Sequence, residues 1–131
     1  MNGQYSEKLP SGGELVVSSS EWHIKYYFPG PDLRYNGTFV TVSGKEIDKY
    51  ITAWKRNFEK YLQLKETIPS GGRFDTPGEM GMTIRIGMWE GVCLNSYHMP
   101  INSRAKLDQV IHDYEFAKER ASKLQKLLQS L

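Results

Sequence analysis

Cys93 and His98 come closest to a catalytic pair in this chain, because a thiol beside an imidazole can act as a nucleophile with its base. The two residues stand five positions apart in residues 92–98, a segment whose sequence predicts a β-strand. Side chains alternate between the two faces of a strand, so an odd separation places them on opposite faces. We therefore expect no catalytic dyad, and we interpret Cys93 as a small buried apolar residue.

The sequence predicts no metal or phosphate site. The three histidines lack the spacing of metal ligands: His23, His98 and His112. Gly44-Lys45 precedes a predicted helix, as a phosphate-binding loop does, but the upstream glycine and the following Ser or Thr are missing. Glu46 occupies that following position, and its carboxylate would repel a phosphate group. We expect no cofactor and no metal ion.

A catalytic acid–base pair also lacks a defined place in the sequence. Acidic residues fall in predicted loops or turns, and nothing fixes the distances between them: Asp32, Asp75, Glu79 and Glu90. No serine lies in the G-x-S-x-G context of a hydrolase nucleophile. We therefore expect a protein without enzymatic activity.

The composition is typical of a soluble globular protein in a reducing compartment. With 131 residues, 39% of them apolar and 24% charged, the chain is long enough for one domain with its own core. Its single cysteine excludes an internal disulfide framework. No apolar run approaches the roughly 20 residues that span a bilayer, and the N-terminus does not resemble a signal peptide. We expect a cytoplasmic protein that does not bind membranes.

The clearest predicted element is a helix from about residue 45 to Thr67. Ser43 and Glu46 have the spacing of a capping box, and Val42 and Ile47 are placed as a hydrophobic staple. Apolar residues then recur at helical spacing along one face: Ile47, Tyr50, Ile51, Trp54, Phe58, Tyr61 and Leu62. A proline and two glycines soon after Thr67 predict that the helix ends there.

Strands are predicted on both sides of this helix. The segments with alternating or β-branched sequence are residues 14–17, 22–28, 38–42, 80–88 and 92–98. In residues 80–88 one face carries Met80, Met82, Ile84, Ile86 and Met88, and the other carries Gly81, Thr83, Arg85 and Gly87. Residues 1–13 are polar, and we expect a flexible N-terminal arm there, followed by a single domain over residues 14–131.

A second long helix is predicted from Arg104 to about Leu128, with Asn102 or Ser103 as its cap. Its apolar residues recur every seven positions, as in a coiled-coil dimer seam. Two of the eight seam positions are alanine and one is tyrosine, which favours a helix lying on the sheet over that alternative. The expected fold is therefore α+β, an antiparallel sheet of about five strands with two long helices packed on one face. We expect a monomer or a weak homodimer.

Aromatic and charged residues left over from the predicted core could form an outer patch on the sheet. Exposed Trp, Tyr and Arg side chains are typical anchors of protein interfaces. The predicted partner-binding residues are Tyr27, Asp32, Asp75, Arg85, Trp89, Glu90, Tyr97 and His98. The alternative interpretation is that the second helix covers this face of the sheet.

Two other functions are compatible with the sequence. A small enzyme or ligand-binding domain could use the face of Arg85, and it would need a deep polar pocket at Arg85, Thr83 and Tyr97. A nucleic-acid-binding protein could use the basic C-terminal helix, although the net charge of +2 is too small to imply such a partner. We expect a protein partner and no nucleic acid.

Three stretches carry a resemblance to a known class of proteins: residues 42–51 (Val-Ser-Gly-Lys-Glu-Ile-Asp-Lys-Tyr-Ile), residues 81–87 and residues 96–101. From Thr41 to about Ala121 the chain resembles the small immunity proteins of bacterial polymorphic and contact-dependent toxin systems. The resemblance implies a cytoplasmic protein that binds a cognate toxin domain, often a nuclease, and blocks it without catalysis. Inhibitors of basic nucleases are usually acidic and this chain is not. A local acidic patch must then serve, or the toxin is not strongly basic.

Overall fold

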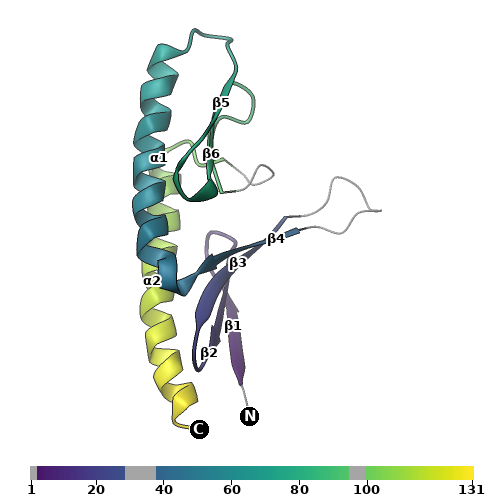
Figure 1. Ribbon diagram of the computed structural model, residues 1–131, viewed down its shortest axis with the longest axis vertical. Coiled ribbons are helices and arrows are strands. Elements are labelled where there is room, and N and C mark those ends of the chain that lie inside the picture. Colours follow the sequence, from purple (N-terminus) through teal and green to yellow (C-terminus); the bar gives the residue numbers. More distant parts are fainter. Residues whose placement is uncertain (1–2, 29–37, 95–99) are drawn as a thin grey trace, which may run out of the picture. The chain divides into compact units, whose positions relative to one another are not determined.

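Figure 1 shows the computed structural model of the chain, which describes residues 3–28, 38–94 and 100–131. Within these ranges the fold is α+β, with two long helices and two antiparallel sheets. The chain divides into two compact units, Met1–Asp48 with Gln109–Leu131, and Lys49–Asp108. No helix in the described part of the chain is both long enough and apolar enough to cross a membrane.

The first unit contains the sheet β1-β2-β3-β4, named here in its spatial order. Its strands are β1 (Gln4–Lys8), β2 (Glu14–Ser18), β3 (Trp22–Phe28) and β4 (Thr38–Ser43), and neighbouring strands are antiparallel. The alternation predicted for residues 22–28 is confirmed on β3, where Ile24 and Tyr26 are buried. Ile24 is fully buried together with the aliphatic side chains of Leu15, Val17 and Val42 on the neighbouring strands. This row of aliphatic side chains forms the core of the unit.

The helix α2 (Arg104–Gln129) covers this sheet with its C-terminal part. Tyr114 is fully buried, and its hydroxyl accepts a hydrogen bond of 3.2 Å from Tyr26 of β3. Gln125 donates to the Ser18 carbonyl over 3.2 Å. The helix begins as predicted, because the Ser103 hydroxyl accepts from a first-turn amide. Five of the eight apolar heptad positions are buried in the protein's own core: Leu107, Val110, Tyr114, Ala117 and Ala121.

The strand β1 corrects the expectation of a flexible arm over residues 1–13. Residues 4–8 pair with β2 through the backbone, from Gln4 opposite Ser18 to Lys8 opposite Glu14. The turn that follows is held by a 2.7 Å hydrogen bond from the Leu9 amide to the Gly13 carbonyl, and Leu9 is buried. The strand β1 lies at the edge of its sheet and is held by backbone pairing. Its sequence can therefore be polar, and no apolar alternation predicts the strand.

The second unit is built on the helix α1 (Ile47–Thr67), which enters through a short 3₁₀ turn, η1 (Gly44–Glu46). The Ser43 hydroxyl accepts from the Lys45 amide over 3.3 Å and caps this turn. The helix ends at Thr67, as predicted. Its predicted apolar face is also confirmed, since the aromatic side chains of Trp54, Phe58 and Tyr61 are each 1% exposed.

The sheet of this unit has the order β5-β6-β7, formed by β5 (Phe74–Pro77), β6 (Thr83–Ile86) and β7 (Gly91–Cys93). Met82, Ile84 and Ile86 are buried as predicted. The predicted strand over residues 80–88 is too long at both ends. Met80 lies in the 3₁₀ turn η2 (Glu79–Gly81) with a positive φ of 55°, and Met88 is 58% exposed.

The expectation of one five-stranded sheet is wrong, because the described strands form two separate sheets. The strands before α1 pair only among themselves, and so do those after it. Alternation along a strand shows which face is buried but carries no information on which strand is its neighbour. The predicted strand residues 95–98 lie outside the described residues.

Candidate functional site

The turn between β6 and β7 presents two large apolar side chains to solvent. Met88 is 58% exposed and Trp89 is 65% exposed. Trp89 has a φ of +57°, in the left-handed region that bulky residues rarely adopt. Unfavourable backbone conformations of this kind persist where the surroundings enforce them, and they are concentrated at functional sites. The turn is therefore the starting point for a candidate interaction surface.

An open depression of about 330 Å³ lies beside this turn. We call it the Arg85 depression, and it is lined by Arg73, Phe74, Asp75, Arg85, Ile86, Met88 and Trp89. The strand register explains the lining, because Asp75 of β5 is opposite Arg85 of β6 and Phe74 is opposite Ile86. Phe74 is 40% exposed. Three exposed apolar side chains, Phe74, Met88 and Trp89, thus belong to one hollow with two arginines.

Arg85 carries an unsatisfied hydrogen-bond donor. The side chain is half-buried, and its Nε atom is buried with no hydrogen-bond partner among the described residues. A buried donor without a partner costs about 1–3 kcal/mol. Asp75 lies opposite Arg85 on the neighbouring strand and carries the opposite charge. It does not remove this cost, because its carboxylate accepts no hydrogen bond from Nε. Such groups call for a specific explanation.

Cys93 of β7 is a buried apolar residue, as predicted. Burial raises the pKa of its thiol, and the charge of Arg85 offsets only part of that rise. A thiol kept in its neutral form is a poor nucleophile. His98, the other member of the pair considered above, lies outside the described residues.

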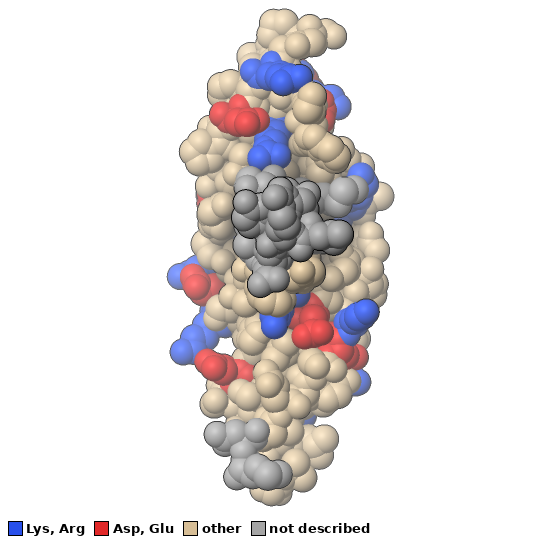
Figure 2. Space-filling view, turned by 90° about the vertical axis from the view of Figure 1, so that its right-hand side faces the viewer, with Lys and Arg blue, Asp and Glu red and all other residues tan. Residues whose placement is uncertain are grey.

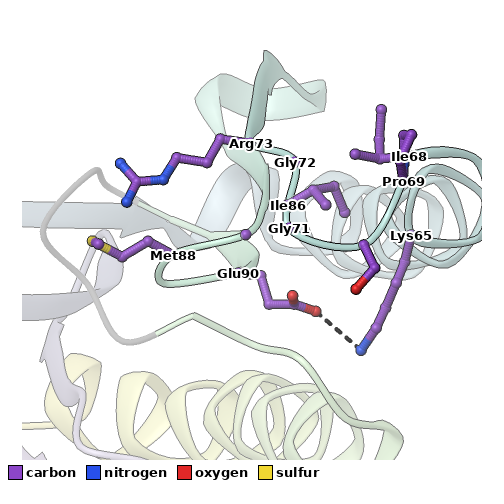
Figure 3. Close-up of a pocket in the computed structure, with 11 residues that line it drawn as sticks. Lys65, Ile68, Pro69, Gly71, Gly72, Arg73, Ile86, Met88 and Glu90 are labelled. Atoms are coloured by element: carbon purple, nitrogen blue, oxygen red, sulfur yellow. Dashed lines mark ion pairs between the residues drawn. The ribbon is translucent and has the colours of Figure 1, made fainter.

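Glu90 belongs to a second hollow of about 490 Å³, which the end of α1 and the loop after it form with the β6–β7 turn (Figure 3). Its carboxylate accepts a 2.5 Å hydrogen bond from the Tyr61 hydroxyl and pairs with Lys65 at 3.0 Å. These hydrogen bonds, first from Tyr61 and then from Lys65, lower the pKa of the Glu90 carboxyl. Glu90 is therefore committed to contacts within the chain.

This second hollow adjoins the Arg85 depression through shared lining residues. The side chains of Arg73 and Met88 extend away from the Lys65–Glu90 ion pair (Figure 3). Both residues line the two hollows, together with Ile86. The β6–β7 turn thus lies between the Lys65–Glu90 ion pair and the exposed apolar side chains of the Arg85 depression.

Two of the four residues of the local acidic patch that the resemblance requires, Asp32, Asp75, Glu79 and Glu90, are paired within the chain. Glu79 pairs with Arg56 at 3.4 Å, and Glu90 pairs with Lys65. Asp32 lies outside the described residues. On the face drawn in Figure 2, basic and acidic side chains are interspersed and neither sign gathers into a large patch. A basic partner that binds through a large acidic patch on this face is therefore not favoured.

Three basic side chains of α2 are paired with acids in the first unit. Lys118 pairs with Asp48 at 2.9 Å, and Arg120 pairs with Glu7 at 2.8 Å. Lys123 pairs with Glu119 one helical turn earlier. These pairs reduce the positive charge that the C-terminal helix would need to bind a nucleic acid.

The structure brings together only part of the predicted partner-binding set. Asp75, Arg85 and Trp89 line one depression, and Glu90 lies beside it. Tyr27 belongs to the first unit, where its ring lies 5.1 Å from that of Phe39. Asp32, Tyr97 and His98 lie outside the described residues.

Sequence reasoning missed three residues of the Arg85 depression: Arg73, Phe74 and Met88. Met88 was assigned to the core row, but Gly87 has a φ of +102° and ends the strand alternation just before it. Gly87 beside a predicted strand was the available signal, since glycine in a strand often marks a bend. Arg73 and Phe74 carried no such signal.

Among the described residues, no group of three or more His, Cys, Asp or Glu side chains is placed to hold a metal ion. No family model, no curated protein and no solved structure matches this chain.

Proposed function

We propose that this protein is a non-catalytic inhibitor of the immunity-protein type, which binds a cognate toxin domain in the cytoplasm and occludes it. The observation that carries the proposal is the group of exposed Phe74, Met88 and Trp89 around the Arg85 depression. Aromatic, methionine and arginine side chains are the types enriched in protein interfaces and their hot spots. The resemblance to immunity proteins supplies the class of partner.

The shape and lining of the depression favour a protein partner over a small ligand. Ligand pockets usually enclose most of the bound molecule, whereas the Arg85 depression is open and its rim carries exposed apolar side chains. The ligand-binding alternative required a deep polar pocket that includes Thr83, and Thr83 is absent from the lining residues of this depression. A rim of this composition suits a partner surface that covers it.

The experiment that tests the proposal is co-expression with the product of the neighbouring gene. We expect the wild-type chain to be captured with that product and to rescue the growth of cells that express it. The double variant Phe74→Ala with Trp89→Ala should lose both capture and rescue. Phe116→Ala is the matched control, because Phe116 is also exposed, at 42%, but lies on α2.

Two results would count against the proposal. One is that the wild-type chain neither binds the neighbouring product nor rescues growth. The other is that the double variant, shown to be folded by circular dichroism, protects cells as well as the wild type.

A further inference from the structure

We propose that the partner contributes a carboxylate, from an Asp or Glu flanked by apolar side chains, that binds Arg85 in the Arg85 depression. This inference rests on the proposed function and names the chemistry of the contact.

The guanidinium of Arg85 presents its N–H groups as a rigid fork that matches the two oxygens of a carboxylate. Its Nε atom is closed to solvent and has no acceptor in the described parts of the chain. A carboxylate from a partner would therefore bind the terminal N–H groups of this fork. A single carbonyl oxygen matches the fork less well, because it has no second oxygen.

The charges of the depression favour an anion. Its lining carries Arg73 and Arg85 against one acid, Asp75. The neighbouring Lys65 and Glu90 neutralise each other through their 3.0 Å ion pair. The depression therefore keeps an excess positive charge, and an incoming acidic side chain complements it.

The apolar rim determines what surrounds that carboxylate. Phe74, Met88 and Trp89 are exposed around the arginines. A partner with apolar residues beside its acid would cover this rim and exclude water from the ion pair. Exclusion of water strengthens the hydrogen bonds of such a pair, and interface hot spots have this arrangement.

Calorimetric titration of the full chain with the purified product of the neighbouring gene tests the inference. Arg85→Gln removes the charge, and Arg85→Lys keeps the charge but removes the fork. We expect each to weaken the affinity by at least about tenfold. The exposed Arg73→Gln should weaken it by only a few-fold, mainly through a slower association rate. Arg56→Lys, a change outside the depression, should leave it within about twofold.

A double-mutant cycle identifies the carboxylate. Each Asp and Glu of the partner is changed to Asn or Gln and titrated against wild-type chain and Arg85→Gln. We expect one partner position whose substitution costs no further affinity once Arg85 is gone. Circular dichroism of each variant shows that it is folded.

The outcomes separate this inference from the proposed function. If the wild-type chain binds no neighbouring product, the proposed function fails and the inference falls with it. If the wild-type chain binds but Arg85→Lys and Arg85→Gln bind equally well, only the inference fails. It also fails if both Arg85 variants weaken binding and no partner carboxylate is coupled to Arg85.

Discussion

Arg85 stands directly opposite Asp75 in the β5–β6 register, and yet its buried Nε–H has no hydrogen-bond partner in the described residues. The sheet thus places opposite charges on neighbouring strands without satisfying the arginine. Buried donors in native proteins are nearly always paired. An exception at the rim of an exposed aromatic surface is the pattern expected where binding, rather than folding, has shaped the site.

This relationship predicts that Arg85 contributes little to stability. Arg85→Met replaces the side chain with an apolar one and removes the unsatisfied donor. We expect the free energy of unfolding in urea to stay the same or to rise by about 1 kcal/mol. Arg104→Met is the control, because Arg104 pairs with Glu59 at 2.7 Å and lies over the Phe58 ring, so its loss should be neutral or mildly destabilising. A loss of more than about 1 kcal/mol for Arg85→Met would contradict the interpretation.

The position of each helix along the chain could be predicted from the sequence, but the pairing of the strands could not. The cap at Ser43 and the end of α1 at Thr67 are local signals, and the structure confirms both. The buried residues Met82 and Ile84 follow from alternation alone. Sheet membership depends on contacts between distant segments, and β1 has no apolar pattern, so neither was visible in the sequence.

The candidate site was predictable only in part, for a similar reason. Residue type pointed to Arg85 and Trp89 as interface anchors, and the structure places both in one depression. Met88 was assigned to the core because alternation continued through it in the sequence. The positive φ of Gly87 redirects the chain there, and a sequence pattern does not report a backbone angle.

The buried Asp113 predicts a stability contribution in the first unit. Its carboxylate is 1% exposed and accepts hydrogen bonds from both the amide and the hydroxyl of Ser11. It thereby ties α2 to the turn between β1 and β2. Asp113→Ala should lower the free energy of unfolding by about 1–3 kcal/mol, because two donors lose a charged acceptor.

The control for this change is Glu115→Ala, an exposed acid on the same helix, which should alter stability by less than about 0.5 kcal/mol. Urea unfolding followed by circular dichroism measures both variants. Equal stabilities for Asp113→Ala and Glu115→Ala would show that the Ser11 contact does not hold the turn.

Glu90 predicts a pH dependence of stability in the acid range. Hydrogen bonds from Tyr61 and Lys65 lower its pKa below the usual 4.5. The unfolded chain therefore takes up the proton at a higher pH than the folded one. The stabilisation is fully present above about pH 4.5 and is lost as the pH falls through the lower pKa of the folded state.

Glu90→Gln should accordingly lower stability by about 1 kcal/mol at neutral pH. The difference from the wild type should shrink as the pH falls below 4.5. Urea titrations at a series of pH values between about 3 and 7 measure this difference. A difference that is constant across that range would exclude a role for the Glu90 carboxylate in acid unfolding.

The most direct test of the account asks which surface the partner covers. A chain labelled with 5-fluorotryptophan carries reporters at Trp22, Trp54 and Trp89, and Trp89 is 65% exposed while Trp54 is 1% exposed. Trp89→Phe assigns the Trp89 resonance in the ¹⁹F spectrum. When the unlabelled product of the neighbouring gene is added, we predict that the Trp89 resonance shifts or broadens while that of Trp54 keeps its position. A complex that forms and leaves the Trp89 resonance unchanged would contradict the account.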